Sequence, residues 1–187
     1  MKNLNDYIVV IKNVLNEDTC NKILNEYKSS EEWKDALVAA SDVAIKQIRN
    51  CQEILMSNPD VINKNYNLRH ALDNDVFTAA SKCIHQYNKK FKYCNIVQDN
   101  GYALLKYEKG GFYTTHTDSS KQHPRAIACS FLLNDDYEGG EFAFFSRELK
   151  YKLNKGDALM FPSNFMYPHE VMPVIKGTRY SIITWFI

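Results

Sequence analysis

The stretch YALLKYEKGGFYTTHTD, residues 102–118, decides the fold class of this chain. It holds two runs, Tyr102–Tyr107 and Phe112–Thr117, that are rich in aliphatic, aromatic and β-branched residues. Gly110-Gly111 separates them. Runs of this kind bounded by glycine are typical of short β-strands joined by a turn. We therefore expect two strands here.

The same pattern continues to the end of the chain. Six further strands are predicted at Ala126–Leu133, Glu141–Phe145, Tyr151–Leu153, Ala158–Phe161, Pro168–Val171 and Tyr180–Phe186. Turns are predicted at Gly139-Gly140, Lys155-Gly156-Asp157 and Lys176-Gly177. Eight short strands in succession favour a double-stranded β-helix, or jelly roll, in which two sheets face one another and few strand edges stay exposed.

Helical patterns occur before residue 100. Tyr7–Ile11 predicts a first strand, and Asn16 is a suitable N-cap for a helix that extends to Tyr27. A second helix is predicted from Asn74 to Lys90. Their apolar faces contain, respectively, Cys20, Ile23, Leu24 and Tyr27, and Phe77, Ala80, Ile84 and Tyr87. Residues 33–70 fit a helix and a strand equally well.

Together these patterns predict an α+β fold in which N-terminal helices pack on one sheet of the jelly roll. We expect one domain over residues 1–187, with a helical support region at 1–100 and a catalytic core at 101–187. A chain of 187 residues with 45% hydrophobic and 13% aromatic residues can form such a core.

Composition argues against several classes of partner and location. The net charge is +1, which gives no indication of nucleic acid or of an anionic membrane surface. The N-terminal residues lack the apolar core of a secretion signal, and no stretch approaches the length of a membrane span. The five cysteines are scattered without a CxxC motif, which argues against disulfides and a zinc knuckle. We expect a cytoplasmic protein.

Two histidines in the β-rich half lie close to other polar residues. His116 and Asp118 are two residues apart on a predicted strand, so their side chains point to the same face. An imidazole nitrogen and a carboxylate oxygen can share a divalent metal, although a surface strand end would also explain this pair. His169 lies on a later predicted strand, where a hydrogen-bonded core histidine is the alternative.

Arg179 stands at the start of the strongly apolar last strand. A buried guanidinium needs a partner, which is either a carboxylate of the protein or a carboxylate of a ligand. Two histidines and one carboxylate on a metal leave three positions open, as in the facial triad of non-haem Fe(II) oxygenases. An arginine beyond such a triad suits 2-oxoglutarate, which chelates iron at one end and carries a carboxylate at the other.

Residues 101–187 resemble the prolyl 4-hydroxylase-like branch of the 2-oxoglutarate/Fe(II) oxygenases. The resemblance begins with Tyr107, Gly110, Phe112-Tyr113, His116 and Asp118, and continues through Arg125 and Leu132-Leu133-Asn134-Asp135. It then includes Glu138-Gly139-Gly140-Glu141, Lys155-Gly156-Asp157-Ala158, Phe161-Pro162, His169-Glu170-Val171 and Gly177-x-Arg179-Tyr180-Ser181. Val10-Ile11-x-x-Val14-Leu15 also looks like the start of that domain.

The resemblance implies a role for each matching residue. His116, Asp118 and His169 would bind the iron, and Arg179 would bind the distal carboxylate of 2-oxoglutarate. The remaining implied positions are Tyr107, Ser181 and Trp185 around the co-substrate, and Arg125 and Tyr113 near the substrate. Some relatives have a second co-substrate tyrosine where this chain has Leu132, which implies fewer partners for that carboxylate.

The implied reaction is O2-dependent C–H hydroxylation coupled to decarboxylation of 2-oxoglutarate to succinate and CO2. The implied cofactors are Fe(II), 2-oxoglutarate and O2, with ascorbate as a candidate reductant and no catalytic residue beyond the metal ligands. The expected substrate is a peptidyl-prolyl or amino-acid side chain, whether in a peptide or a small molecule. Oligomeric state does not follow from the sequence.

Three other functions remain open at this point. A metal-binding jelly roll acting as a sensor or scaffold would not need Arg179. A nucleobase demethylase shares the triad, but the charge balance argues against it. A metal hydrolase needs a general base beside the metal, and Glu170 is the nearby candidate, on the strand face opposite to His169.

Overall fold

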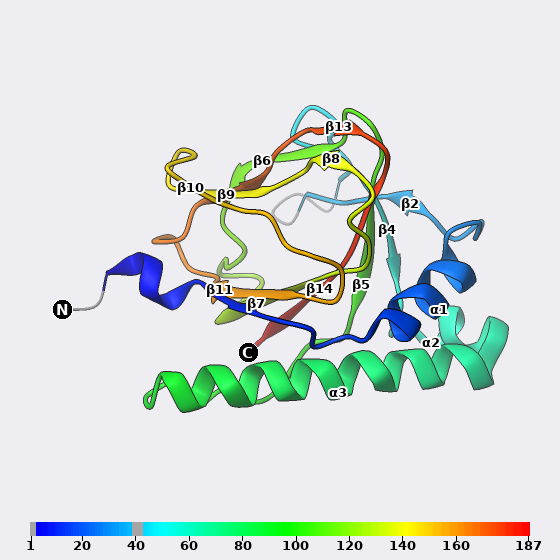
Figure 1. Ribbon diagram of the computed structural model, residues 1–187, viewed down its shortest axis with the longest axis horizontal. Helices are drawn as coiled ribbons and strands as arrows, with labels where there is room; N and C mark the ends of the chain where they lie inside the picture. The colour runs from blue at the N-terminus through cyan, green and yellow to red at the C-terminus, as the bar shows by residue number, and fades with distance from the viewer. Residues whose placement is uncertain (1–2, 39–42) are drawn as a thin grey trace.

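Two antiparallel sheets face one another, and a helical layer lies under the larger one (Figure 1). The computed structural model describes residues 3–38 and 43–187. The larger sheet has the order β1 (Val9–Ile11), β11 (Ala158–Pro162), β7 (Ile127–Leu132), β14 (Arg179–Phe186), β5 (Ala103–Tyr107), β4 (Gln52–Leu55) and β2 (Lys34–Asp35).

The second sheet forms the opposite wall. Its order is β10 (Leu149–Tyr151), β9 (Phe142–Phe144), β12 (His169–Val171), β6 (Phe112–His116) and β3 (Arg49–Asn50). A small sheet pairs β13 (Val174–Lys176) with β8 (Glu138–Gly139). The helices are the 3-10 turns η1 (Leu4–Tyr7) and η2 (Asn63–Asn65), and α1 (Glu17–Tyr27), α2 (Pro59–Ile62) and α3 (Tyr66–Lys90).

The helices cover one face of the seven-stranded sheet. The long helix α3 runs beneath that sheet, with α1 beside it (Figure 1). One apolar cluster joins Ile23 of α1 and Val76 of α3 to Leu104, Phe131 and Ile182 of the sheet. These side chains are fully buried, so helix packing covers the outer face of the sheet. The predicted α+β jelly roll with helices on one sheet is confirmed.

Side-chain alternation along the strands divides the core into two parts. Ile182 on β14 points to the helices, whereas its neighbour Ile183 belongs to a second cluster between the two sheets. Leu104 and Leu105 on β5 divide in the same way. Because successive residues of a strand face opposite sides, every second residue of β14 and β5 is directed into the space between the sheets.

Several element predictions need correction. Helix α3 begins at Tyr66 rather than Asn74, and Phe77 is 52% exposed while Val76 takes the core position. Strand β10 covers Leu149–Tyr151 rather than Tyr151–Leu153, because Leu149 pairs with Phe144 across a tight turn of three positive-φ residues. The short strands β8 and β13 were not expected, since two or three residues carry no periodic signal.

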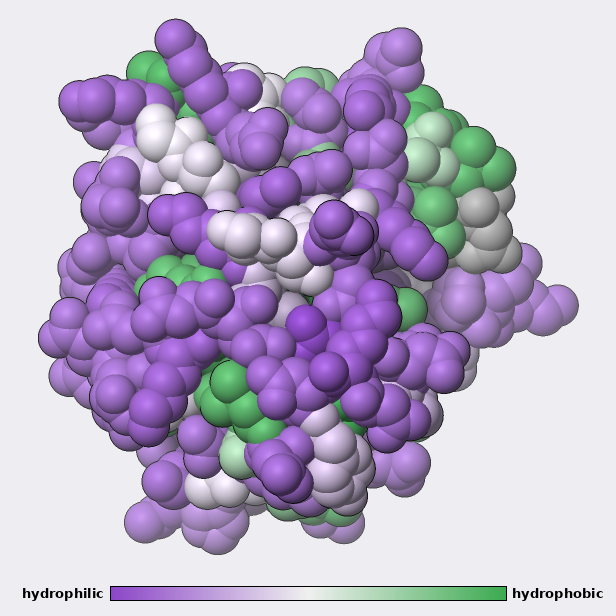
Figure 2. Space-filling model, turned by 90° about the vertical axis from the view of Figure 1, so that its right-hand side faces the viewer, coloured by the Kyte–Doolittle hydropathy of each residue, from purple (hydrophilic) through white to green (hydrophobic). Residues whose placement is uncertain are grey.

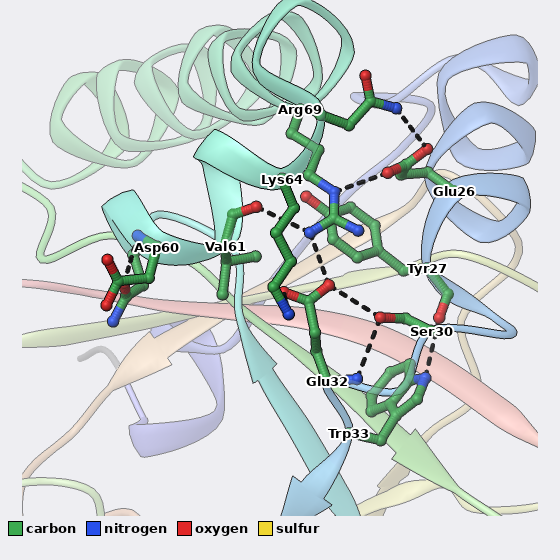
Figure 3. A network of polar contacts seen from close by, with 11 residues as sticks. Glu26, Tyr27, Ser30, Glu32, Trp33, Asp60, Val61, Lys64 and Arg69 are labelled. Carbon is green, nitrogen blue, oxygen red and sulfur yellow. Dashed lines mark hydrogen bonds and ion pairs between the residues drawn. The ribbon is translucent and has the colours of Figure 1, made fainter.

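A buried ion-pair network connects α1 and α3 (Figure 3). Arg69 of α3 is 6% exposed and donates to Glu26 Oε1 and to Glu32 Oε2, each at 2.6 Å. It also donates to the carbonyl of Val61 at 2.8 Å and lies over the ring of Tyr27. Two carboxylates thus satisfy this buried guanidinium within the protein.

The surface on the side of α1 and α2 is mostly hydrophilic, with small separate hydrophobic areas (Figure 2). Among residues 3–38 and 43–187, no helix has the length and apolar character needed to cross a membrane.

Candidate metal centre and co-substrate pocket

The two histidines and the aspartate meet where β6 ends and β12 begins, in the interior of the five-stranded sheet. His116 ends β6 and pairs directly with His169, the first residue of β12. Asp118 lies two residues beyond His116, and its two carboxylate oxygens are each 3.5 Å from one histidine Nε2. One ligand atom from each residue lies within 4.8 Å of the other two. Three donors of this kind can bind one divalent metal from one side.

Both imidazoles are held in the tautomer that suits a metal ligand. His116 Nδ1 is 2.8 Å from the carbonyl of Thr114, and His169 Nδ1 is 3.0 Å from the carbonyl of Tyr167. A carbonyl only accepts, so Nδ1 carries the proton in each ring. The unprotonated Nε2 atoms therefore face Asp118, and backbone contacts of this kind orient metal-ligating histidines.

Burial and mutual charge act on the three groups together. Burial lowers the pKa of His169 to about 4, against the opposing effect of the Asp118 carboxylate. Burial alone would raise the pKa of Asp118, but the two histidines hold it well below its usual range. At neutral pH the site therefore presents a neutral His169 and an ionised Asp118, which are the forms that bind a metal.

A cavity of about 360 Å³ lies between the sheets beside this cluster. All of the predicted site residues line it: Tyr107, Tyr113, His116, Asp118, Arg125, His169, Arg179, Ser181 and Trp185. Arg179, Ser181 and Trp185 lie on the same face of β14, as strand alternation requires. A volume of this size holds a small organic acid.

Arg179 is a buried cation without a carboxylate partner in the described residues. It is 2% exposed, and its Nη1 donates to Ser181 Oγ at 2.7 Å, whereas Nε has no hydrogen-bond partner. Its guanidinium lies about 5.4 Å from the ring centre of Tyr107 and 5.3 Å from that of Phe142. Arg69, also buried, has two carboxylates (Figure 3), so Arg179, unlike Arg69, is available to a carboxylate ligand.

Gly140 leaves the space that the Arg179 stem occupies. A Cβ on Gly140 would lie 3.0 Å from Cδ of Arg179, and the glycine has φ +67°. Any other residue would be strained there and would press on Arg179. The Gly139-Gly140 pair of the sequence thus contributes to the pocket as well as to a turn.

Aromatic side chains support the polar groups of the cavity. Tyr107 is 1% exposed, and burial raises the pKa of its hydroxyl far above the usual value, so it stays neutral. The Tyr113 ring stacks on His116 with centroids 3.5 Å apart. Arg125 lies flat on Trp185, with its Cζ 3.5 Å from the ring centre.

Some lining residues were not predicted from the sequence. Phe142 and Phe161 pack beside His169, and Leu37, Arg49, Glu53 and Leu55 come from the segment of ambiguous pattern. Leu132, where some relatives have a tyrosine, is 1% exposed and lies on β7 opposite Ser181. A buried Arg–Glu pair such as Arg49–Glu53 has no sequence signal unless the strand pairing is known.

Comparison with known proteins agrees with this geometry. Residues 102–187 match the family model described as the 2OG-Fe(II) oxygenase superfamily. A PKHD-type hydroxylase of Aliarcobacter butzleri is 30% identical over 181 residues, which cover 89% of this chain and 70% of that protein. The chain belongs to the 2OG-Fe(II) oxygenase superfamily. It is therefore a 2-oxoglutarate-dependent dioxygenase that uses Fe(II), 2-oxoglutarate and O2.

Other relatives cover the chain to different extents. A PKHD-type hydroxylase of Synechococcus sp. (strain CC9311) is 26% identical over 92% of this chain and 74% of its own length. One from Idiomarina loihiensis is 38% identical over 89 residues, which are 44% of this chain and 40% of that protein. The chain thus spans well under two thirds of some relatives that it matches.

Solved structures of low identity share the fold. A prolyl hydroxylase of Trichoplax adhaerens, in complex with a peptide of hypoxia inducible factor, has TM-score 0.73 and 21% identity. The two structures match over 98% of this chain and 85% of the Trichoplax chain. A viral collagen prolyl hydroxylase of Paramecium Bursaria Chlorella virus-1 has TM-score 0.69 and 19% identity, with coverages of 96% and 95%.

Proposed function

We propose that residues 1–187 form a single oxygenase domain, with residues 101–187 as its catalytic core, that hydroxylates a peptidyl-prolyl or amino-acid side chain. In this proposal His116, Asp118 and His169 bind Fe(II), and Arg179 binds the distal carboxylate of 2-oxoglutarate. Arg179 is the observation that carries it: its guanidinium is 2% exposed, has no carboxylate partner among the described residues, and lines the same cavity as the triad.

The residues of the chain have distinct tasks in this reaction. The triad holds the metal on one side, and its backbone contacts prevent the imidazoles from turning. Ser181 fixes one edge of the Arg179 guanidinium and Tyr137 also contacts the group, which leaves Nε without a partner in the protein and available to a carboxylate. The neutral Tyr107 hydroxyl and Trp185 line the same cavity and would orient the co-substrate.

Fe(II) held by the triad and 2-oxoglutarate held by Arg179 would supply the oxidising chemistry, in which one oxygen atom of O2 enters succinate as CO2 is released and the other enters the hydroxylated product. The protein excludes water from that chemistry. Phe142 and Phe161 are buried beside His169, and Val171 and Ile183 extend the apolar lining. A dry pocket protects a reactive oxidant from side reactions.

The other functions are less well supported. A scaffold that only binds metal would not need a buried arginine free of protein carboxylates. A hydrolase would need Glu170 as a base, but both of its oxygens accept from Arg147, at 2.6 Å from Nε and 3.1 Å from Nη2. The choice of a prolyl or amino-acid substrate rests on the PKHD-type relatives and on prolyl hydroxylases of the same fold.

The first test is the anaerobic complex of the apoprotein with Fe(II) and 2-oxoglutarate. Wild type should develop the visible charge-transfer band of chelated 2-oxoglutarate. His169→Ala should lose the band, and Arg179→Ala should need much more 2-oxoglutarate to reach it. His85→Ala, which removes an exposed histidine of α3, is the matched control and should behave as wild type. A folded, iron-loaded wild type without a band at high 2-oxoglutarate would contradict the proposal.

A further inference from the structure

The positive and negative charges that line the cavity do not cancel, even when those of its proposed ligands are included. The described lining residues include three arginines, Arg49, Arg125 and Arg179, and two carboxylates, Asp118 and Glu53. Fe(II) brings two positive charges and 2-oxoglutarate two negative ones, so the loaded site keeps one positive charge. This count rests on the proposed function. A partly buried excess charge favours a ligand of opposite sign.

Two of the three arginines have partners in this arrangement. The distal carboxylate of 2-oxoglutarate would neutralise Arg179. Arg49 is 9% exposed and pairs with Glu53, whose Oε2 is 3.4 Å from its Nη2. Its Nη1 also donates to the carbonyl of Leu37 at 2.6 Å. The remaining positive charge is therefore that of Arg125.

Arg125 is positioned but not neutralised. Its guanidinium lies on the ring of Trp185, and Nη1 donates to the backbone carbonyl of Asp118 at 3.3 Å. Its Nε is buried without a hydrogen-bond partner. No carboxylate of residues 3–38 or 43–187 forms an ion pair with it; burial lowers the pKa of Arg125, and the nearby Asp118 carboxylate, which would bind the iron, opposes this. Stacking fixes the plane of the guanidinium and leaves part of its edge available to a second partner.

Arg125 also stands where the cavity meets a neighbouring depression. That depression, of about 350 Å³, shares Leu55, Ala103, Arg125 and Trp185 with the cavity. Its other lining residues include Ser57, Asn58 and Asn100, which are polar. A substrate that reaches the metal from this side passes Arg125, and its remainder lies against groups that form hydrogen bonds.

We propose that the substrate carries a carboxylate and that Arg125 binds it, so that the enzyme selects anionic over neutral molecules. The carboxylate belongs either to an acidic residue near the hydroxylated residue of a peptide, or to the α-carboxylate of a free amino acid. Both sources present the same planar group to the guanidinium, which binds carboxylates through paired hydrogen bonds.

The test compares matched substrates on the iron-loaded enzyme with 2-oxoglutarate and O2. One arm uses terminally blocked pentapeptides in which the central residue varies and one flanking residue is aspartate or asparagine. The other arm uses free amino acids and their amides. Succinate formation above the uncoupled rate and a mass gain of one oxygen are measured. One arm should show carboxylate-bearing members with kcat/KM about 10- to 100-fold above their neutral matches, as expected for a charge-assisted hydrogen bond.

Variants assign this preference to Arg125. Arg125→Gln should abolish it, and Arg125→Lys should retain part of it. Lys121→Gln removes an exposed positive charge from the same loop without touching the cavity, and it should keep the wild-type preference. Normal formation of the Fe(II)–2-oxoglutarate band by Arg125→Gln shows that the fold and the co-substrate site are intact.

Three results would overturn the inference: equal turnover of neutral and acidic members, a preference that survives Arg125→Gln, or no turnover of any carboxylate-bearing member. Each can occur with a normal charge-transfer band, in which case the oxygenase proposal stands and only the substrate class is wrong. Loss of the band in wild type would instead mean that the proposed site itself has failed.

Discussion

Replacing Arg179 with methionine should separate ligand binding from stability. Methionine keeps most of the apolar stem beside Tyr107 and Phe142 but removes the charge and the donors. With Nη1 held by Ser181, at least two N–H groups of Arg179 are left for the co-substrate carboxylate. Two charge-assisted hydrogen bonds at about 1.5–3 kcal/mol each amount to roughly 3–6 kcal/mol. The dissociation constant of 2-oxoglutarate should therefore rise by a factor on the order of 100 to 10,000.

In the apoprotein, by contrast, Arg179→Met should not lower the free energy of unfolding. Without 2-oxoglutarate, Arg179 is a buried charge that no described carboxylate neutralises, so Arg179→Met should leave the free energy of unfolding unchanged or raise it by about 1–2 kcal/mol. Arg69→Met is the matched control, because Arg69 is equally buried but has two carboxylates. It leaves Glu26 without its cation, while Glu32 keeps Lys64 at 3.2 Å, and should destabilise by about 3 kcal/mol.

Both quantities are directly measurable. Titration of the anaerobic charge-transfer band gives the dissociation constant, and urea denaturation of the apoproteins gives the free energies of unfolding. The reasoning is refuted if Arg179→Met destabilises the apoprotein as much as Arg69→Met does. It also fails if the affinity for 2-oxoglutarate changes less than about 10-fold, since either result would give Arg179 a structural role.

Three further predictions concern other parts of the molecule. The pKa of His169 is about 4 in the folded apoprotein and about 6.5 when unfolded, so the unfolded chain binds more protons between these values. In denaturation experiments the free energy of unfolding should therefore fall by up to about 1.4 kcal/mol per pH unit as the pH drops through this window. His169→Asn should lack this contribution. Gly140→Ala and Gly110→Ala both strain a positive φ, but only the former presses on Arg179, so a thermal-shift titration should show weaker 2-oxoglutarate binding for Gly140→Ala alone. Asn16→Ala removes the side-chain cap of α1 and should lower the free energy of unfolding by about 0.5–2 kcal/mol in urea denaturation, with 2-oxoglutarate affinity unchanged.

The residues proposed to bind the metal and the co-substrate line one cavity, and strand alternation accounts for part of this grouping. Asp118 lies in a bend two residues past the end of β6, so alternation does not fix its direction there. Arg179, Ser181 and Trp185 share a face of β14 by strand alternation. Helices cover the opposite face of that sheet, so a polar residue directed away from them enters the space between the sheets. Local spacing therefore grouped the three residues of β14. Joining His169 and Arg179 to the pair His116 and Asp118 depended on the chemistry of the four residues together and on the family resemblance.

The segment from residue 33 to 70 could not be predicted in this way. It contributes the strands β2, β3 and β4, of two to four residues each, followed by α2, η2 and the first residues of α3. β3 pairs with β6 and β4 pairs with β5, so both strands depend on partners about fifty residues or more along the chain. Strands this short have no measurable period, and pairing over such distances leaves no local pattern.

This difference has a functional consequence. The family match begins at residue 102 and includes the triad and Arg179, whereas Leu37, Arg49, Glu53 and Leu55 lie outside it. Glu53 and Leu55 come from β4 of the same sheet as the last strand, and Arg49 comes from β3 of the five-stranded sheet. Leu55 also lines the depression beside Arg125. The shared part of the pocket therefore accounts for the reaction class. Strands β3 and β4 bring Arg49, Glu53 and Leu55 to the cavity by long-range pairing, so relatives with the same triad can differ in this part of the cavity lining.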